Sequence, residues 1–182
     1  MKPVRLETSR LVLDQPTLDD VDLVTDYCRD PIFERYMVTP WPYRRSDAEL
    51  FIGELVPRWW NEDSEYTWAL RLDGELIGVI GYRTHGKDIG FWLGKPHRGE
   101  GYMTEAVAAV LDWIFERSDD DVLWECMPGN AASVAVARKN GFSFQGSGIA
   151  IFTNRDGDHP IAWKGTLGKI DSREPKSGWP VL

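Results

Sequence analysis

The sequence predicts a domain of mixed α and β structure, in which a mostly antiparallel sheet is flanked by helices. Two observations lead to this prediction. Three β-prone runs at residues 66–72, 75–82 and 88–93 follow one another across short turns, which is typical of an antiparallel meander. The chain then alternates strand, helix and strand, and such an alternation requires a parallel crossover. We therefore expect an α/β (α+β) fold with both strand orientations in one sheet.

The first elements are expected to be a short strand and a helix. Residues 9–14 (SRLVLD) are rich in β-prone side chains. Thr17 followed by Asp20 is typical of a capping box, so a helix is expected from there to about Cys28. Residues 36–43 (YMVTPWPY) form an aromatic, proline-rich stretch that favours a loop.

A second helix is expected to open at Ser46, because Glu49 completes another capping-box signature. Pro57 is expected to interrupt or end its regular part, since proline lacks the N–H that a helix interior needs. The helical spacing places four apolar side chains on one face. They are Leu50, Phe51, Leu55 and Trp59.

Turn residues and changes of apolar spacing mark the boundaries of the meander and of the elements after it. Asp73-Gly74 separates the first two β-prone runs and is a strong hairpin signal. A helix is expected at residues 104–117, where apolar residues recur with helical spacing. Strand, helix, strand and strand are then expected at residues 122–127, 130–140, 142–152 and 161–166. We expect one domain over residues 1–168, followed by a loose polar tail over residues 169–182.

Composition excludes several classes of protein. The formal net charge of −8 argues against binding to a phosphate backbone, so no nucleic-acid partner is expected. The sequence contains no apolar run long enough for a membrane span and no apolar stretch behind Met1, so we expect neither a membrane partner nor a secretory signal. Cys28 and Cys126 are far apart, which fits reduced thiols in a cytoplasmic protein. No His, Cys or carboxylate cluster has metal-ligand spacing, so no metal is expected.

Residues 95–106 (KPHRGEGYMTEA) predict an anion-binding turn. Glycines allow close backbone approach, and the helix that begins there offers unpaired N–H groups and the positive end of its dipole. A Walker A loop is excluded because Gly101 is followed by Tyr102, and a dinucleotide fingerprint because Thr104 replaces its third glycine. The alternative is a turn that only caps the helix, with Arg98 on the surface.

A second motif decides between these alternatives. Residues 130–142 read NAASVAVARKNGF, about thirty residues after the glycines. With RGEGYMTEA, the meander and the opening ETSRLVLDQPTLDD, this motif resembles the GNAT superfamily of N-acetyltransferases. Within it, the chain resembles the ribosomal-protein N-acetyltransferase-like branch, and the resemblance covers nearly the whole chain.

The resemblance implies a single-domain GNAT fold with a splayed parallel strand pair, residues 88–93 and 122–127. It also implies acetyl-CoA as the acyl donor. The loop Arg98, Gly99, Glu100, Gly101, Tyr102, Met103 and Thr104 would hold its pyrophosphate, although Met103 replaces the usual small residue. Backbone groups of Trp92 and Leu93 would bind the pantetheine arm, and Asn130 and Ser133 would contact its far side.

Acetyl transfer to an amine requires a base, because an ammonium ion is no nucleophile. The resemblance implies Glu125, on the strand that faces the donor; a solvent-facing glutamate is the equal alternative. Asp88 occupies roughly the place of a catalytic carboxylate in other members, and a simple turn residue is the alternative. An oxyanion would need a donor such as a backbone N–H on the splayed strand.

The general acid is less well defined. The tyrosine common in the superfamily would fall at Ala137 and is absent. Ser133 matches the serine of serine-type ribosomal acetyltransferases, but the partner glutamate would fall at Phe152, and a helix cap or donor contact is the alternative. Trp41 and Tyr43 are expected to shape the acceptor pocket, with ordinary packing as the alternative.

The sequence thus predicts an N-acetyltransferase that uses acetyl-CoA and acts by direct transfer in a ternary complex. The acceptor is expected to be a primary amine, either a protein N-terminus or a small molecule, and the acidic balance favours a cationic one. Two rival hypotheses stay open: a CoA-binding module with little or no turnover, and a transferase for a larger acyl group. Relatives are often dimers, so the resemblance also leaves a homodimer open.

Overall fold

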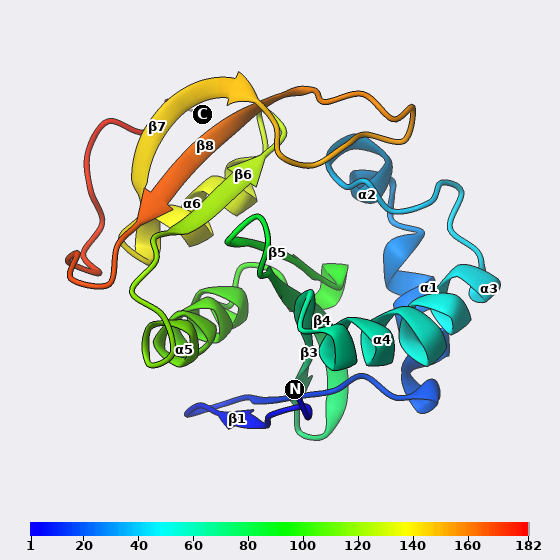
Figure 1. Ribbon diagram of the computed structural model, residues 1–182. Helices are drawn as coiled ribbons and strands as arrows, with labels where there is room; N and C mark the ends of the chain where they lie inside the picture. Colours follow the sequence, from blue (N-terminus) through cyan, green and yellow to red (C-terminus); the bar gives the residue numbers. More distant parts are fainter. Residues whose placement is uncertain (182) are drawn as a thin grey trace.

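An eight-stranded sheet forms the centre of the structure, a computed structural model that describes residues 1–181. The strand order is β1-β2-β3-β4-β5-β6-β8-β7, and all neighbours are antiparallel except β5 and β6 (Figure 1). The mostly antiparallel sheet with one parallel pair is therefore confirmed. The strands are β1 (Leu6–Glu7), β2 (Val12–Asp14), β3 (Glu65–Leu72), β4 (Glu75–Arg83), β5 (Asp88–Leu93), β6 (Val122–Cys126), β7 (Ser143–Ile149) and β8 (Ile161–Leu167).

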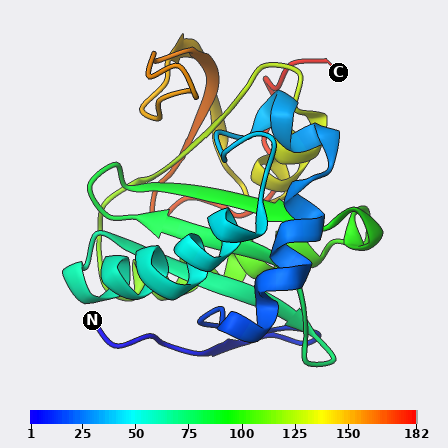
Figure 2. The same ribbon diagram turned by 90° about the vertical axis from the view of Figure 1, so that its right-hand side faces the viewer.

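Helices cover both faces of this sheet. They are α1 (Val21–Cys28), α2 (Pro31–Tyr36), α3 (Arg45–Leu50), α4 (Val56–Glu62), α5 (Tyr102–Phe115) and α6 (Ala131–Lys139). Helices α1, α3 and α4 lie across one side, as Figure 2 shows, whereas α5 and α6 lie together on the other. Successive residues of β3 point to opposite faces of the sheet. Trp68 belongs to the core beneath α5, and Ala69 belongs to the core beneath α1 and α3.

The parallel pair diverges soon after it begins. Strands β5 and β6 are paired only at Asp88 with Leu123 and at Ile89 with Trp124. Beyond these pairs β5 continues to Leu93 along β4, while β6 continues along β8. The splay that the family resemblance implied is therefore present, and it leaves the inner edges of both strands free of each other.

The helices of the first third differ from the prediction. The second helix has Arg44 as its N-cap, two residues before Ser46, and the Arg44 backbone N–H donates to the Asp47 carboxylate at 2.7 Å, so the assignment of the cap to Ser46 was wrong. The helix also continues through a π-helical turn, η2 (Phe51–Leu55), into α4, with Pro57 accommodated in the first turn of α4. This turn rotates the buried face, so Leu50 is 46% exposed and Ala48, Ile52, Val56 and Trp60 are buried instead.

Residues 169–181 contain no helix or strand, as expected, but the expectation that they are loose was wrong. Trp179 packs edge-on against Trp124 of the sheet, with ring centroids 5.4 Å apart, and Lys176 donates a hydrogen bond to Ser143 at 2.9 Å. Apolar burial of a tryptophan outweighs the polar composition of the segment around it. None of the helices within residues 1–181 is long and apolar enough to cross a membrane.

The start of α5 is tied to the N-terminal segment by Glu105. Its carboxylate accepts hydrogen bonds from the Thr8 and Ser9 hydroxyls and from the backbone and side chain of Arg10. Although burial acts in the opposite direction, these hydrogen bonds lower the pKa of Glu105 to about 2. A carboxylate in the first turn also complements the helix dipole.

We expect Glu105→Gln to lower the free energy of unfolding by about 1–2 kcal/mol at neutral pH. The pKa of Glu105 is depressed by folding, so its stabilising contribution is complete above the unfolded value of 4.5 and is lost as the pH falls toward about 2. Urea unfolding of both proteins between pH 7 and pH 2 measures this. A difference in unfolding free energy that is as large at pH 2 as at pH 7 would contradict the assignment.

Candidate active site

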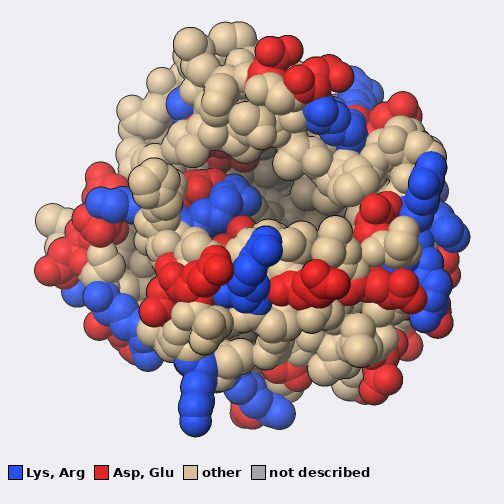
Figure 3. Space-filling model, turned by 45° about the vertical axis from the view of Figure 1, so that its right-hand side comes forward, with Lys and Arg blue, Asp and Glu red and all other residues tan. Residues whose placement is uncertain are grey.

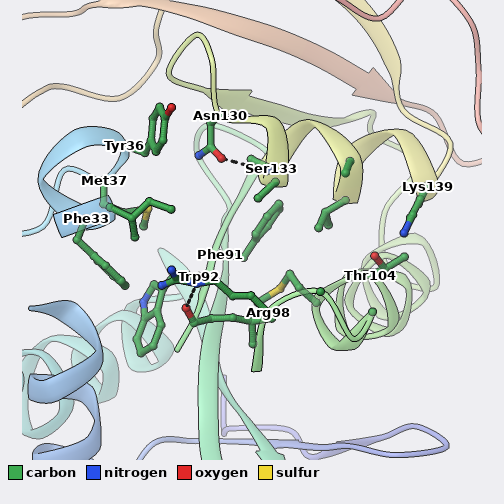
Figure 4. Close-up of a pocket in the computed structure, with 18 residues that line it drawn as sticks. Phe33, Tyr36, Met37, Phe91, Trp92, Arg98, Thr104, Asn130, Ser133 and Lys139 are labelled. Atoms are coloured by element: carbon green, nitrogen blue, oxygen red, sulfur yellow. Dashed lines mark hydrogen bonds between the residues drawn. The ribbon is translucent and has the colours of Figure 1, made fainter. Parts of the chain in front are cut away.

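Two adjoining cavities lie where β5 and β6 diverge. The larger, of about 230 Å³, runs between α2, the end of β5, the loop before α5 and the start of α6 (Figure 4). The smaller, of about 100 Å³, lies between β5, β6 and the segment after α2. Both are lined by Tyr36, Met37, Phe91, Asn130 and Ser133, so these residues mark where the cavities meet. We call them the donor cavity and the acceptor cavity, after the substrates that the sequence prediction would place in them.

A row of unpaired backbone amides lies at the entrance of the donor cavity. Gly99 and Gly101 have φ angles of 91° and 82°, a backbone conformation that favours glycine. Within residues 1–181, the N–H groups of residues 99–104 donate no hydrogen bond. Successive free amides at a helix N-terminus form a concave anion site, and the positive end of the α5 dipole adds to it.

Arg10 supports this loop from outside. Its guanidinium donates to the carbonyl oxygen of Glu100 at 3.0 Å and lies over the ring of Tyr102, with 4.5 Å from Cζ to the ring centroid. It is also paired with Glu105, at 2.7 Å from Nε to Oε2. The loop is therefore fixed before any ligand binds, which reduces the entropic cost of binding an anion.

Arg98 holds the other end of the loop. Its Nε donates to the carbonyl oxygen of Leu93 at 2.9 Å, as the dashed line in Figure 4 shows, and its Nη1 lies 2.8 Å from Asp30. Although burial acts the other way, the Ile32 amide and the Arg98 guanidinium lower the pKa of Asp30. The Arg98 side chain lines the donor cavity but is engaged with the protein, so it also locks the turn after β5.

A buried carboxylate stands in the acceptor cavity. The side chain of Glu125 is 3% exposed, and its Oε2 accepts a hydrogen bond from the Ile151 amide at 2.7 Å. Lys164, its cross-strand neighbour on β8, brings Nζ to 2.7 Å from Oε1. Oε1 is therefore paired with an ammonium and Oε2 with a backbone amide. Glu125 thus offers a carboxylate that is fixed from both sides at the wall of the cavity.

Arg83 forms the floor beside it and is held from below by Asp88. Arg83 lines the acceptor cavity, and its Nε lies 3.1 and 3.0 Å from the two carboxylate oxygens of Asp88. Although burial acts the other way, nearby carboxylates hold the pKa of Arg83 above its usual value; they belong to Asp88, Glu65 and Glu125. Figure 3 shows charged side chains of both signs inside the central hollow of this face.

Comparison with known proteins identifies the family. The sequence model described as "Acetyltransferase (GNAT) domain" matches residues 10–143, well over half of the chain. The chain belongs to the GNAT acetyltransferase family. The chain is therefore an N-acetyltransferase of the GNAT type, as the sequence predicted.

Relatives of this GNAT acetyltransferase include the uncharacterized N-acetyltransferase p20 of Bacillus licheniformis, 28% identical over 79% of this chain and 84% of that protein. The ribosomal-protein-serine acetyltransferase of Escherichia coli (strain K12) is 30% identical over 41% of this chain and 45% of its own length. Among solved structures, RimL, the ribosomal L7/L12 alpha-N-protein acetyltransferase, in complex with coenzyme A has a TM-score of 0.74 at 18% identity, over 91% of this chain and 98% of that one. These similarities confirm the fold and the relation to ribosomal-protein acetyltransferases.

Most predicted donor-site residues line the donor cavity of this GNAT acetyltransferase. Those that do are Trp92, Leu93, Arg98, Gly99, Gly101, Met103, Thr104, Asn130 and Ser133. Glu100 and Tyr102 do not, and both of them contact Arg10 on the outside of the loop. The Oδ1 of Asn130 caps α6 by accepting a hydrogen bond from the Ser133 amide at 3.1 Å. This oxygen is therefore already engaged, and the side-chain NH₂ of Asn130 is the group that faces a ligand more freely.

Other predicted site residues are placed differently. Asp88 is 2% exposed, lines neither cavity and is bound to Arg83, so it positions that guanidinium. Tyr43 is 5% exposed within the core beneath α1 and α3, and Trp41 packs against the same core. Neither lines a cavity, so ordinary packing, the alternative left open by the sequence, describes both. Residues 1–181 contain no cluster of metal-binding side chains.

The sequence did not reveal the wall formed by α2. Phe33, Tyr36 and Met37 line the donor cavity from this short helix and the residue after it. The signal that could have found it is Asp30-Pro31, since the Asp30 side chain caps the helix by accepting from the Ile32 amide and Pro31 occupies its first turn.

Arg155 holds α2 in place. It lies in the loop between β7 and β8, which reaches across to α2 in Figure 1. Its guanidinium donates four hydrogen bonds of 2.7–2.9 Å to carbonyl oxygens at the end of α2 and just beyond it. They belong to Phe33, Glu34, Met37 and Thr39. A helix end leaves such carbonyls unpaired, so one arginine satisfies the end of α2 and joins the two walls of the site.

Proposed function

We propose that this GNAT acetyltransferase transfers the acetyl group of acetyl-CoA to a primary amine, which attacks the thioester directly in a ternary complex. One observation carries the proposal: a cavity that begins at free backbone amides joins, at Ser133, a second cavity that contains a buried carboxylate. A donor with an anionic end and an acceptor that must lose a proton would fit these two cavities in that order.

The donor cavity suits coenzyme A. The free N–H groups of residues 99–104 would hold the pyrophosphate, as the resemblance implied. The apolar length between Trp92, Phe91 and Val136 suits the pantetheine arm, whose amides would meet the edge of β5 beyond the splay. RimL in complex with coenzyme A and the microcin C7 self-immunity acetyltransferase MccE in complex with acetyl-CoA and AMP share this fold, with TM-scores of 0.74 and 0.73.

In the acceptor cavity, Glu125 would act as the general base. The Ile151 amide and Lys164 fix its carboxylate, which would take the proton of the amine as the N–C bond forms. A backbone N–H on the splayed part of β5 would stabilise the oxyanion. The acceptor would be a protein N-terminus or a small amine, and ribosomal proteins are the substrates named for several relatives.

The experiment follows free thiol while acetyl-CoA is incubated with a panel of amines, including short peptides with free N-termini, polyamines and amino sugars. Thiol release above the rate without enzyme, for at least one amine, is the expected result. Tight coenzyme A binding without any amine-dependent release would favour the CoA-binding module instead. Repeating the assay with longer acyl thioesters tests the larger-acyl alternative, which predicts a higher kcat/KM for one of them than for acetyl-CoA.

A further inference from the structure

Ser133, at the junction of the two cavities, is bound to a buried tryptophan. The Nε1 of Trp124 donates a hydrogen bond to the Oγ of Ser133 at 3.0 Å. Trp124 precedes Glu125 on β6, is 1% exposed and contributes to the wall of the acceptor cavity. An indole N–H can only donate, so the Ser133 oxygen is the acceptor in this bond.

The hydroxyl proton of Ser133 therefore points away from Trp124 and toward another group. Within residues 1–181, the group that this hydroxyl meets is the thiol of Cys126. Burial raises the pKa of that thiol to about 12, and a hydrogen bond with Ser133 acts in the opposite direction. A neutral thiol is a weak acceptor, so the hydroxyl proton stays available to a group in the cavities.

The tryptophan itself is held from behind by the C-terminal segment. Trp179 packs against it with an interplanar angle of 65°, and Trp179 also lies 5.3 Å from the ring of Phe144. Gly165 on β8 leaves room for both indoles, because a Cβ there would lie 3.3 Å from Trp124 and 3.6 Å from Trp179. The direction of the Trp124 N–H is thus fixed by close packing on both sides.

We propose that Trp124 is a positioning residue for Ser133, orienting its hydroxyl to donate a hydrogen bond to the sulfur that leaves during acyl transfer. The inference rests on the proposed function. As the amine nitrogen bonds to the acetyl carbon, the carbon–sulfur bond breaks and its electron pair stays on sulfur. Glu125 takes the amine proton, and Ser133 keeps its own proton while it donates to the developing thiolate. The glutamate that the resemblance placed beside this serine is Phe152 here, so Trp124 supplies the contact that fixes the hydroxyl.

A purely structural role makes a different prediction, because any buried indole needs an acceptor. Trp60 illustrates that role: it is also 1% exposed, and its Nε1 donates at 3.0 Å to the backbone oxygen of Thr67, far from both cavities. Trp60→Phe therefore removes the same kind of hydrogen bond and the same buried volume. It is the matched control for Trp124→Phe.

The test is a double-mutant cycle of Trp124→Phe and Ser133→Ala, measured with the best amine from the panel. We expect each single variant to lower kcat about 5- to 10-fold, because a hydrogen bond to a charged atom is lost, with little change in KM for acetyl-CoA. The double variant should have the kcat of Ser133→Ala alone, within about 2-fold. Trp60→Phe should lower the Tm by a similar amount and leave kcat unchanged. Both single-variant effects should shrink with a thioester of a more acidic thiol.

Two results would overturn the inference while the proposed function stands: an unchanged kcat for Trp124→Phe, or losses that multiply in the double variant. Absence of turnover in the unaltered protein would instead reject the proposed function. If Trp124→Phe is unfolded at the assay temperature, benzothienylalanine at position 124 keeps the indole shape without the N–H. The same expected and contrary results apply to that variant.

Discussion

Glu125→Gln is expected to lower kcat for acetyl transfer about 100-fold near pH 7, because the variant has no general base for the amine. The amide keeps the shape of the carboxylate, and its oxygen can still accept from the Ile151 amide. The donor cavity does not include this residue, so the Kd for acetyl-CoA should change less than about 2-fold. The measurement is steady-state kinetics with the best amine, together with calorimetric titration of acetyl-CoA.

The pH dependence separates a base from a structural carboxylate. Without a base, only the amine that bulk water has already deprotonated can react, so the rate of the variant should rise about tenfold per pH unit below the pKa of the amine. The unaltered enzyme should show a shallower rise. Glu174→Gln, which changes an exposed carboxylate in the C-terminal segment, should match the unaltered enzyme at every pH. Unchanged kinetics of Glu125→Gln would reject Glu125 as the base and leave the role to a water molecule.

The turn before α5 could be predicted from the sequence because its determinants are local. Gly99, Gly101 and the start of α5 lie within a few residues of one another, so the turn, the free amides and the helix dipole are all encoded in one short stretch. The antiparallel meander could also be predicted, since the Asp73-Gly74 turn and the two β-prone runs on either side of it are short-range signals.

The acceptor side depends on contacts that are distant in sequence. The position of α2 is fixed by Arg155, which donates a hydrogen bond to the carbonyl oxygen of Phe33, 122 residues earlier in the sequence. No local sequence pattern predicts this bond. The buried state of Glu125 likewise depends on Lys164 and on the Ile151 amide, both from the β7–β8 hairpin. Sequence alone therefore left a solvent-facing glutamate as an equal alternative, and tertiary packing resolved it.

Trp41 and Tyr43 were expected to shape the acceptor pocket, but the structure packs them against the core. An aromatic residue in a loop can serve a pocket or a core, because its large apolar surface is favourable in either place. Tyr43 lies in the core between α1 and α3, and burial raises its pKa above the usual value, with smaller contributions from Cys28 and Asp47. Neither Trp41 nor Tyr43 lines the two cavities, whose aromatic lining includes Phe33, Tyr36 and Phe91 instead.

Gly101→Val is expected to weaken acetyl-CoA binding about 30-fold, which corresponds to about 2 kcal/mol. Gly101 has φ 82°, a conformation that a β-branched residue adopts only with strain, so the row of free amides would be distorted. The added side chain would also stand where a phosphate must approach the backbone. A Cβ at this position has only Arg10 Nη2 nearby, at 3.5 Å, so steric conflict within the protein is not the cause.

Gly74→Val provides the matched control for this prediction. Gly74 has φ 89° in the β3–β4 turn and nothing within 4 Å of an added Cβ, so this variant should lose a similar amount of stability and bind acetyl-CoA normally. Acetyl-pantetheine, which lacks the pyrophosphate, should be used equally well by Gly101→Val and by the unaltered enzyme. If the loop binds pyrophosphate, Gly101→Val therefore lowers kcat/KM with acetyl-CoA alone. Equal losses with both donors would show that the substitution disturbs the catalytic geometry, and unaltered acetyl-CoA affinity would refute the anion-binding role of the loop.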